Sequence, residues 1–159
     1  MQTSREQGIP MATWESLTRH LKSKYRVVAT DELDMLSLRI PLDDGHTQQV
    51  AVREMVYKGA EWAEVSAVVA EVSQVDPRHC LERNASLLGA GLAFSDDLVI
   101  LRRSLPLAGM DEADFDPPMH VVVELGHRLA GELMAHAAAV EPAAEPAPPP
   151  RPGRHTSWG

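Results

Sequence analysis

Residues 81–107 constrain the fold of this chain more than any other segment. The segment reads as the end of a helix, a glycine-containing turn, two apolar runs separated by Asp96 and Asp97, and a final Leu-Pro-Leu at residues 105–107. Aspartate is a typical turn residue, and proline disfavours the continuation of a strand. Several element boundaries therefore fall close together, and none of them resembles a catalytic signature. The pattern predicts a small α+β binding module specified by its tertiary topology.

Composition narrows the classes of function. The chain has 159 residues, which suits one domain, and a net charge of −8, which argues against nucleic-acid binding because that requires clustered Lys and Arg. The acidic run at residues 111–116 is interpreted as the start of a helix, with an acidic docking face as the alternative. The single cysteine cannot form an intramolecular disulfide, so we expect a reducing, cytoplasmic location. Neither a signal-peptide pattern nor a long apolar span occurs, so no membrane association is expected.

The first half of the chain predicts one helix followed by strands. Trp14, Leu17, Leu21 and Tyr25 share one helical face, and Thr13 is a plausible N-cap. Short apolar alternation then predicts strands at residues 26–29, 35–42, 48–57 and 62–72, with turns at residues 31–34, 43–46 and 58–60. Residues 61–71 also show helical spacing, but their β-branched residues favour a strand.

The second half predicts two helices around a hairpin. Asp76 followed by Pro77 is typical of a helix start, and this helix is expected to run to about Leu88 and end at Gly89 or Gly91. A hairpin with strands at residues 92–94 and 98–103 follows. Residues 116–118, Asp-Pro-Pro, repeat the cap-and-proline pattern and predict a closing helix of about twenty residues.

The two ends of the chain differ from its body. Residues 1–11 are expected to form a flexible leader, with Met11 as an alternative natural start, and residues 12–139 the domain. Residues 140–159 are rich in Pro and Ala, and such a composition cannot bury a core, so we expect a disordered tail. The tail has two prolines three apart followed by Arg151, the spacing of an SH3-type ligand. A simple tether is the main interpretation and a docking peptide the alternative.

Candidate metal ligands occur on the last predicted helix. His120, Glu124 and His127 can share one helical face and resemble half of a metal–carboxylate helix site. Neither other helix offers a matching Glu-x-x-His unit. We therefore expect no metal and no cofactor, and interpret the three residues as a polar helix face or a dimer seam.

No catalytic residues are predicted. Cys80 follows His79, but adjacent helical positions point about 100° apart, so His79 is badly placed to act as a base. Cys80 is interpreted as a buried, inert residue. Gly89 and Gly91 follow a helix and precede a strand, the reverse of the order in a phosphate-binding loop, and are interpreted as a helix C-cap. Since no catalytic motif occurs, the protein is not expected to be an enzyme.

The predicted order of helix, strands, helix, hairpin and helix resembles the bacterial secretion-chaperone-like fold, which unites type III secretion (Tir-type) effector chaperones with the YbjN-like family. The resemblance covers residues 12–138 and is carried by the following motifs: Trp14-x-x-Leu17, Trp62-Ala-Glu-Val-Ser66, Leu81-Glu-Arg-Asn84, Gly91-Leu-Ala-Phe94-Ser-Asp-Asp97-Leu98-Val-Ile-Leu101 and Leu105-Pro106-Leu107. It implies a small, acidic, cytoplasmic, usually dimeric protein without enzymatic activity. In effector chaperones of this fold, apolar patches on the sheet and first helix bind an extended client segment.

The leading hypothesis is therefore a homodimeric chaperone-like or adaptor module that binds a segment of a client or partner protein. The residues expected to form the partner-binding surface are Trp14, Leu17, Leu21, Leu36, Leu38 and Ile40. The alternative for each of them is a place in the core. A second hypothesis is a regulatory component whose domain dimerises and whose proline-rich tail recruits a partner.

Overall fold

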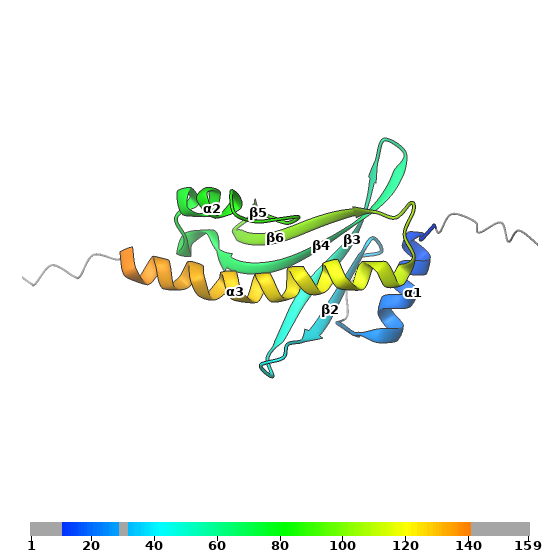
Figure 1. Ribbon diagram of the computed structural model, residues 1–159, viewed down its shortest axis with the longest axis horizontal. Helices are drawn as coiled ribbons and strands as arrows, with labels where there is room; N and C mark the ends of the chain where they lie inside the picture. The colour runs from blue at the N-terminus through cyan, green and yellow to red at the C-terminus, as the bar shows by residue number, and fades with distance from the viewer. Residues whose placement is uncertain (1–10, 29–31, 141–159) are drawn as a thin grey trace, which may run out of the picture.

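The computed structural model describes residues 11–28 and 32–140. Three α-helices and six strands make up an α+β fold, as the sequence predicts (Figure 1). In chain order the elements are α1 (Trp14–Lys24), β1 (Arg26–Val28), β2 (Met35–Pro41), β3 (Thr47–Tyr57), β4 (Ala60–Glu71), η1 (Val72–Gln74), α2 (Pro77–Asn84), β5 (Gly91–Ser95), β6 (Leu98–Pro106), η2 (Glu112–Phe115) and α3 (Asp116–Val140).

All six strands form one antiparallel sheet in the order β1-β2-β3-β4-β6-β5. Helix α3 lies along one face of this sheet, next to β4 and β6 (Figure 1). Helix α1 lies near the beginning of α3, and α2 lies at the opposite end, beside β5. The sheet edges are therefore β1, close to α1, and β5, close to α2.

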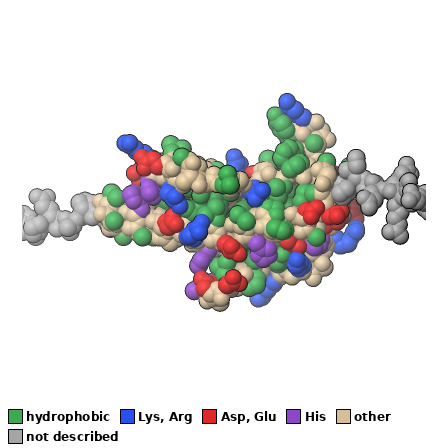
Figure 2. Space-filling model, in the orientation of Figure 1, with side chains coloured by type: hydrophobic (Ala, Val, Ile, Leu, Met, Phe, Trp, Pro, Cys, Tyr) green, Lys and Arg blue, Asp and Glu red, His purple; other side chains and the backbone are tan. Residues whose placement is uncertain are grey.

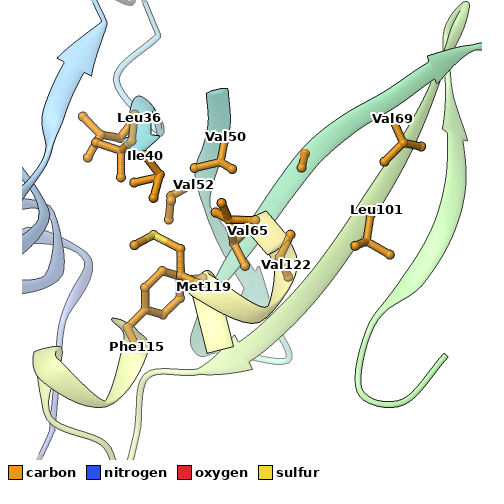
Figure 3. Packing of buried hydrophobic residues seen from close by; sticks show 14 of the residues in the cluster. Leu36, Ile40, Val50, Val52, Val65, Val69, Leu101, Phe115, Met119 and Val122 are labelled. Atoms are coloured by element: carbon orange, nitrogen blue, oxygen red, sulfur yellow. The ribbon is translucent and has the colours of Figure 1, made fainter. Parts of the chain in front are cut away.

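The core lies between α3 and the sheet face that it covers. Alternate strand residues point to this face, as expected for the two-residue period of a strand. Phe115 and Met119 are fully buried against them, and each such side chain stabilises the fold by about 1.5–3 kcal/mol. The core residues labelled in Figure 3 are Leu36, Ile40, Val50, Val52, Val65, Val69, Leu101, Phe115, Met119 and Val122.

Helix α3 approaches the sheet most closely at Gly126. A Cβ atom placed on this glycine would lie 3.1 Å from the Cβ of Ala67 in β4, tighter than an ordinary van der Waals contact. Two small residues therefore face each other where the helix crosses the strand. Beside this crossing, the register of β4 with β6 shifts between Val68 and Ala70, which places a bulge in β4.

Most predicted element starts are confirmed. Thr13 is the N-cap of α1, and Asp76 caps α2 with Pro77 in its first turn. The segment that also fitted a helical spacing is the longest strand, β4. The β5–β6 hairpin turns at Asp96 and Asp97, as predicted.

The predicted end of the second helix is wrong. Helix α2 ends at Asn84, before the expected Leu88, and its C-cap is Ala85 instead of a glycine. The Asn84 side chain donates to the Leu92 carbonyl at 3.0 Å and accepts from the Leu92 amide at 2.6 Å. This pair of bonds to β5 ties the last residue of the helix to the sheet. Gly89, with φ of +72°, lies in the connecting loop.

The predicted N-cap role of Asp116 is also wrong. Its backbone is already helical, with φ of −61° and ψ of −51°. Asp116 is both the C-cap of η2 and the first residue of α3. The acidic run does begin a helical segment, because Asp111 and Asp114 form a capping box around η2. The Asp116 carboxylate is thereby free to contact α1.

No helix in residues 11–28 and 32–140 is long and apolar enough to cross a membrane. The structure follows α3 to Val140 and pairs Met11 with Ala108 in an isolated bridge. The rest of the predicted leader and of the Pro/Ala-rich tail, including the SH3-like spacing, lies outside the described residues. The domain boundaries at residues 12 and 139 stay predictions.

Candidate partner-binding surface

Helix α1 is fixed at its start and along one face. Thr13 Oγ1 accepts a bond from the Ser16 amide at 3.1 Å, and Ser16 Oγ accepts one from the Thr13 amide at 2.9 Å. This capping box satisfies two amides that a helix start leaves without partners. Leu17 and Leu21 are fully buried. The helix therefore has a set orientation on the sheet.

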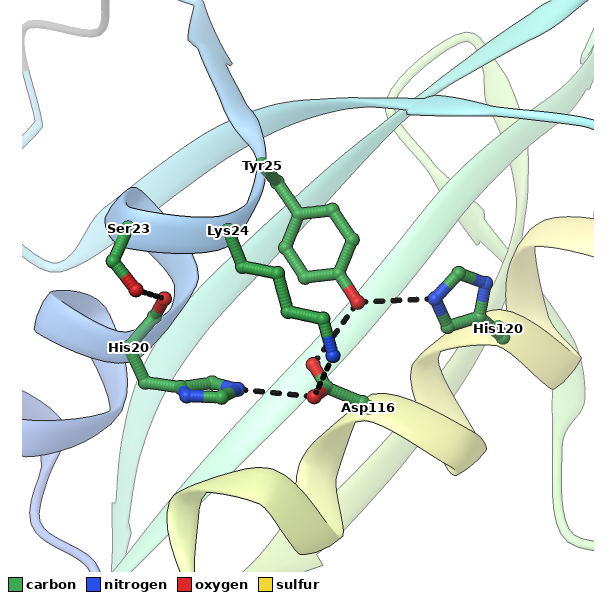
Figure 4. A network of polar contacts seen from close by, with 6 residues as sticks. All are labelled: His20, Ser23, Lys24, Tyr25, Asp116 and His120. Carbon is green, nitrogen blue, oxygen red and sulfur yellow. Dashed lines mark hydrogen bonds and ion pairs between the residues drawn. The ribbon is translucent and has the colours of Figure 1, made fainter.

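The C-terminal end of α1 is joined to α3 by five side chains, which we call the anchor cluster (Figure 4). One oxygen of Asp116 lies 2.7 Å from Lys24 Nζ and 3.0 Å from His20 Nε2, and the other accepts from Tyr25 Oη at 3.0 Å. Tyr25 Oη also lies 3.0 Å from His120 Nε2. Residues separated by about 90 positions in the sequence thus meet around one carboxylate.

The charges in the anchor cluster support each other. Burial by itself would raise the pKa of the Asp116 carboxyl, but hydrogen bonds from Lys24, His20 and Tyr25 outweigh this effect and lower the pKa. The hydrogen bond to Asp116 raises the pKa of the Lys24 ammonium, and burial raises that of the Tyr25 phenol. Both oxygens of the carboxylate are occupied by donors. The cluster is therefore built to hold α1 on α3.

An apolar groove lies between α1 and the sheet edge at β1. It has a volume of about 370 Å³. Trp14, Thr18 and Lys22 form the wall from α1, since residues four apart share one helical face. Val27 of β1 and Leu33 of the β1–β2 connection line the groove as well.

The groove exposes apolar surface beside an open strand edge. The Leu33 side chain is 100% exposed and that of Val27 is 38% exposed. Among the described residues, strand β1 pairs with β2 alone, so its other edge is the end of the sheet. Open edges and apolar pockets are the two features by which a sheet binds an extended peptide.

Comparison with known proteins identifies the fold. No protein-family model and no curated protein matches the chain. The crystal structure of the ExsC–ExsE complex contains a chain with a TM-score of 0.53 and 15% identity; the match covers 75% of this chain and 91% of that chain. The chain has a secretion-chaperone-like fold.

Two further solved structures match with TM-scores below 0.5. The HopA1–SchA chaperone–effector complex matches with a TM-score of 0.47 and 13% identity, over 72% of this chain and 88% of that chain. YbjN, a putative transcription regulator from E. coli, matches with a TM-score of 0.44 and 15% identity, over 80% of this chain and 93% of that chain.

Within this secretion-chaperone-like fold, the six residues predicted to bind a partner are divided between the groove and the core. Trp14 is half-buried and lines the groove. The other five are buried core residues, and one of them, Leu36, also lines the groove: Leu17, Leu21, Leu36, Leu38 and Ile40. The reason is that the alternating residues of β2 point into the core cluster, to which α1 and α3 also contribute buried side chains. Alternation identifies the apolar face of a strand but not whether a helix covers it.

Sequence reasoning missed three apolar residues of the groove. Val27, Leu33 and Met35 line it together with Trp14. Leu33 carried a detectable signal, because it is the one apolar residue in the predicted turn at residues 31–34, Asp-Glu-Leu-Asp. An apolar residue isolated in a polar turn has no core to enter and is a candidate for a binding surface.

The predicted polar face of α3 is used by two different neighbours. His120 belongs to the anchor cluster, whereas His127 Nε2 lies 3.1 Å from Asp44 Oδ2 in the β2–β3 turn. The search for a second half of a metal site covered only the other two helices, so it did not include Asp44 in this turn.

Cys80 is buried, and burial, followed by the charge of Asp76, raises the pKa of its thiol. A raised pKa keeps the thiol protonated and poorly nucleophilic. His79 points elsewhere and stacks on His136 of α3, with ring centroids 3.7 Å apart. Both findings agree with the interpretation of Cys80 as an inert residue.

Proposed function

We propose that this protein is a non-enzymatic, chaperone-like adaptor that binds an extended segment of a partner protein in the groove between α1 and β1. The observation that carries the proposal is the combination of an open strand edge with exposed apolar side chains, above all Leu33 and Val27. The fold supports it, since a chain of the same fold lies in the ExsC–ExsE complex of two proteins.

Each part of the groove has a distinct task in this proposal. Apolar side chains of the partner enter the hollow against Trp14, Val27 and Leu33, and their burial drives binding. The free edge of β1 offers backbone groups to the partner segment, and the alternation of side chains selects which residues face the hollow. The anchor cluster holds α1 on α3, so the wall of the groove that α1 forms is in place before the partner arrives.

A matched pair of substitutions tests the groove. Leu33→Gln removes the most exposed apolar side chain of the groove, and Leu88→Gln removes one that is 92% exposed outside it. We expect the full chain with Leu33→Gln to lose about tenfold in affinity for the partner, as for a binding hot spot, and Leu88→Gln to bind normally. A partner is first captured from the native cells with the full chain. Its affinity for each purified variant is then measured by calorimetry. Equal binding by both variants would contradict the proposal.

We further propose that the chain forms a homodimer through α2 and β5. Strand β5 is the second open edge of the sheet, and a hollow of about 230 Å³ lies between it and α2. Leu81 and Phe94 line this hollow and are 71% and 47% exposed. A second copy would bury the same patch on both subunits, as a two-fold interface requires.

The dimer proposal is tested by the solution mass. Leu81→Asp places a charge at the centre of the hollow but on an exposed helix face, so folding should persist. Light scattering is expected to give twice the chain mass for the native protein and the monomer mass for the variant. A native chain that is monomeric at high concentration would refute the interface and leave the groove proposal intact.

The regulatory alternative, in which the tail recruits the partner, makes an opposite prediction. Deletion of residues 141–159 should abolish partner binding if the tail is the ligand and leave it unchanged if the groove is the site. We propose a cytoplasmic location for the protein, which is consistent with a chain that has one cysteine and therefore no intramolecular disulfide.

A further inference from the structure

The β2–β3 hairpin crosses the middle of α3 (Figure 1), and histidine and acidic side chains gather at the end of this hairpin (Figure 2). Asp44 and His46 of the turn meet His127 of α3 there, which brings three potential ligands together. Gly45, with φ of +83°, allows the tight turn between Asp44 and His46. The Asp44 carboxylate accepts the His46 amide at 2.9 Å and lies 3.1 Å from His46 Nδ1 through the same oxygen. Its other oxygen lies 3.1 Å from His127 Nε2. We call these three residues the hairpin cluster.

The hairpin cluster has a donor set suited to a metal ion. One ring nitrogen from each histidine and one carboxylate oxygen lie within 4.8 Å of one another. The two rings are tilted by 33°, with centroids 5.7 Å apart, and each has one nitrogen 3.1 Å from the Asp44 carboxylate. Two imidazoles and one carboxylate form a ligand set found for Zn²⁺ and for other borderline divalent metals.

The spacing is close to what such an ion requires. In a tetrahedral zinc site with bonds of about 2.0–2.1 Å, neighbouring ligand atoms lie about 3.3 Å apart. Each histidine nitrogen lies 3.1 Å from a carboxylate oxygen of Asp44, which is Oδ1 for His46 and Oδ2 for His127, so a rotation of the carboxylate lets one oxygen serve beside both nitrogens. All three side chains are exposed, so small rotations can bring the two nitrogens closer together. The proton on each facing nitrogen can move to the opposite ring nitrogen, which leaves a neutral imidazole with its lone pair toward the metal.

We propose that Asp44, His46 and His127 bind Zn²⁺ or a similar borderline divalent metal ion and thereby clip the β2–β3 hairpin to α3. Three protein ligands leave at least one coordination position for water or for a fourth ligand from outside. The ion connects an exposed turn to the helix that organises the core. This site is independent of the α1–β1 groove, and its failure would not affect the proposed partner binding.

The test uses the untagged full chain and zinc chloride. Calorimetry at pH 7.5 is expected to give one zinc ion per chain, and His46→Ala, Asp44→Ala and His127→Ala should each weaken binding at least tenfold. His136→Ala is the matched control, because it removes another histidine of α3 outside the cluster. Zinc binding that persists in His46→Ala and His127→Ala, or that is lost equally in His136→Ala, would overturn the proposal.

A second measurement separates a clip from loose surface binding. Zinc should raise the melting temperature of the native chain and slow hydrogen exchange at the β2–β3 turn, and both effects should vanish in His127→Ala. Magnesium should not compete, because it prefers oxygen ligands. Zinc binding without any change in exchange at the turn would refute the clip.

Discussion

The anchor cluster and the hairpin cluster use similar residues for different purposes. In each, an aspartate contacts histidine and joins α3 to another part of the chain. The Asp116 side chain is 10% exposed, and its two oxygens receive three donors from α1 and its C-cap. The Asp44 side chain is 48% exposed and faces two histidines in water. Burial and the number of donors, not the residue types, distinguish the two clusters.

This difference separates a structural role from a ligand-binding role. A buried carboxylate must keep its donors, because an unpaired charge in a poorly solvated site is costly. An exposed carboxylate can exchange its partners for an ion at little cost. We therefore expect substitutions in the anchor cluster to change stability, and those in the hairpin cluster to change metal binding.

The largest expected effect comes from Asp116→Asn. The variant keeps the size of the side chain but removes the charge that pairs with Lys24, so the free energy of unfolding should fall by about 2–3 kcal/mol. Asp44→Asn is the matched exposed variant and should leave the free energy of unfolding nearly unchanged. Urea unfolding monitored by circular dichroism measures both. Equal losses would contradict the contrast between the clusters.

The difference between native and Asp116→Asn chains should also depend on pH. The pKa of Asp116 is lowered in the folded state. Its stabilisation is therefore complete above the unfolded pKa of about 3.9 and is lost as pH falls through the lower folded value. Unfolding curves from pH 6 to pH 2.5 should show the two chains converging only below about pH 4. A constant gap across this range would mean that the carboxylate charge is not its source.

A smaller effect is expected for Tyr25→Phe. The substitution removes one hydroxyl group that bonds to Asp116 and contacts His120, but it keeps the ring in place. The loss should be about 1–1.5 kcal/mol, the range for such hydrogen bonds. Combined with Asp116→Asn, the losses should be less than additive, because Asp116→Asn removes the charge that strengthens the same hydrogen bond. Full additivity in urea unfolding would show that the two residues act independently.

The smallest effect is expected for His127→Gln in a metal-free buffer. The exposed pair with Asp44 should contribute little to stability, because water screens both partners. With zinc present, the native chain should gain stability and the variant should not. The difference between their free energies of unfolding should therefore increase. A large loss without metal would make the hairpin cluster a second structural anchor.

Local rules predicted the starts of the elements because these depend on a few neighbouring residues. Thr13 and Asp76 each supply a side chain that accepts from an amide two or three residues later. The β-branched content of β4 likewise outweighed its helical spacing. Such signals act over one turn or one strand, so the sequence contains them directly.

The errors arose where a distant contact decides the outcome. Asn84 ends α2 because it bonds to Leu92 of β5, and Asp116 serves α1 instead of capping its own helix. Leu38 and Ile40 are buried because α1 and α3 occupy their side of the sheet. The hairpin cluster combines a turn with a helix about 80 positions away in the sequence, and no spacing rule relates them.

The close approach at Gly126 has a consequence for both clusters. Bulky Val122, Val123 and Leu129 flank this glycine on the buried side of α3, so a slide by one turn would drive a large side chain into Ala67. The contact therefore sets the axial register of the helix. Asp116 and His127 lie on either side of it, about three turns apart. One pair of small residues thus fixes where α3 meets α1 and where it meets the β2–β3 hairpin.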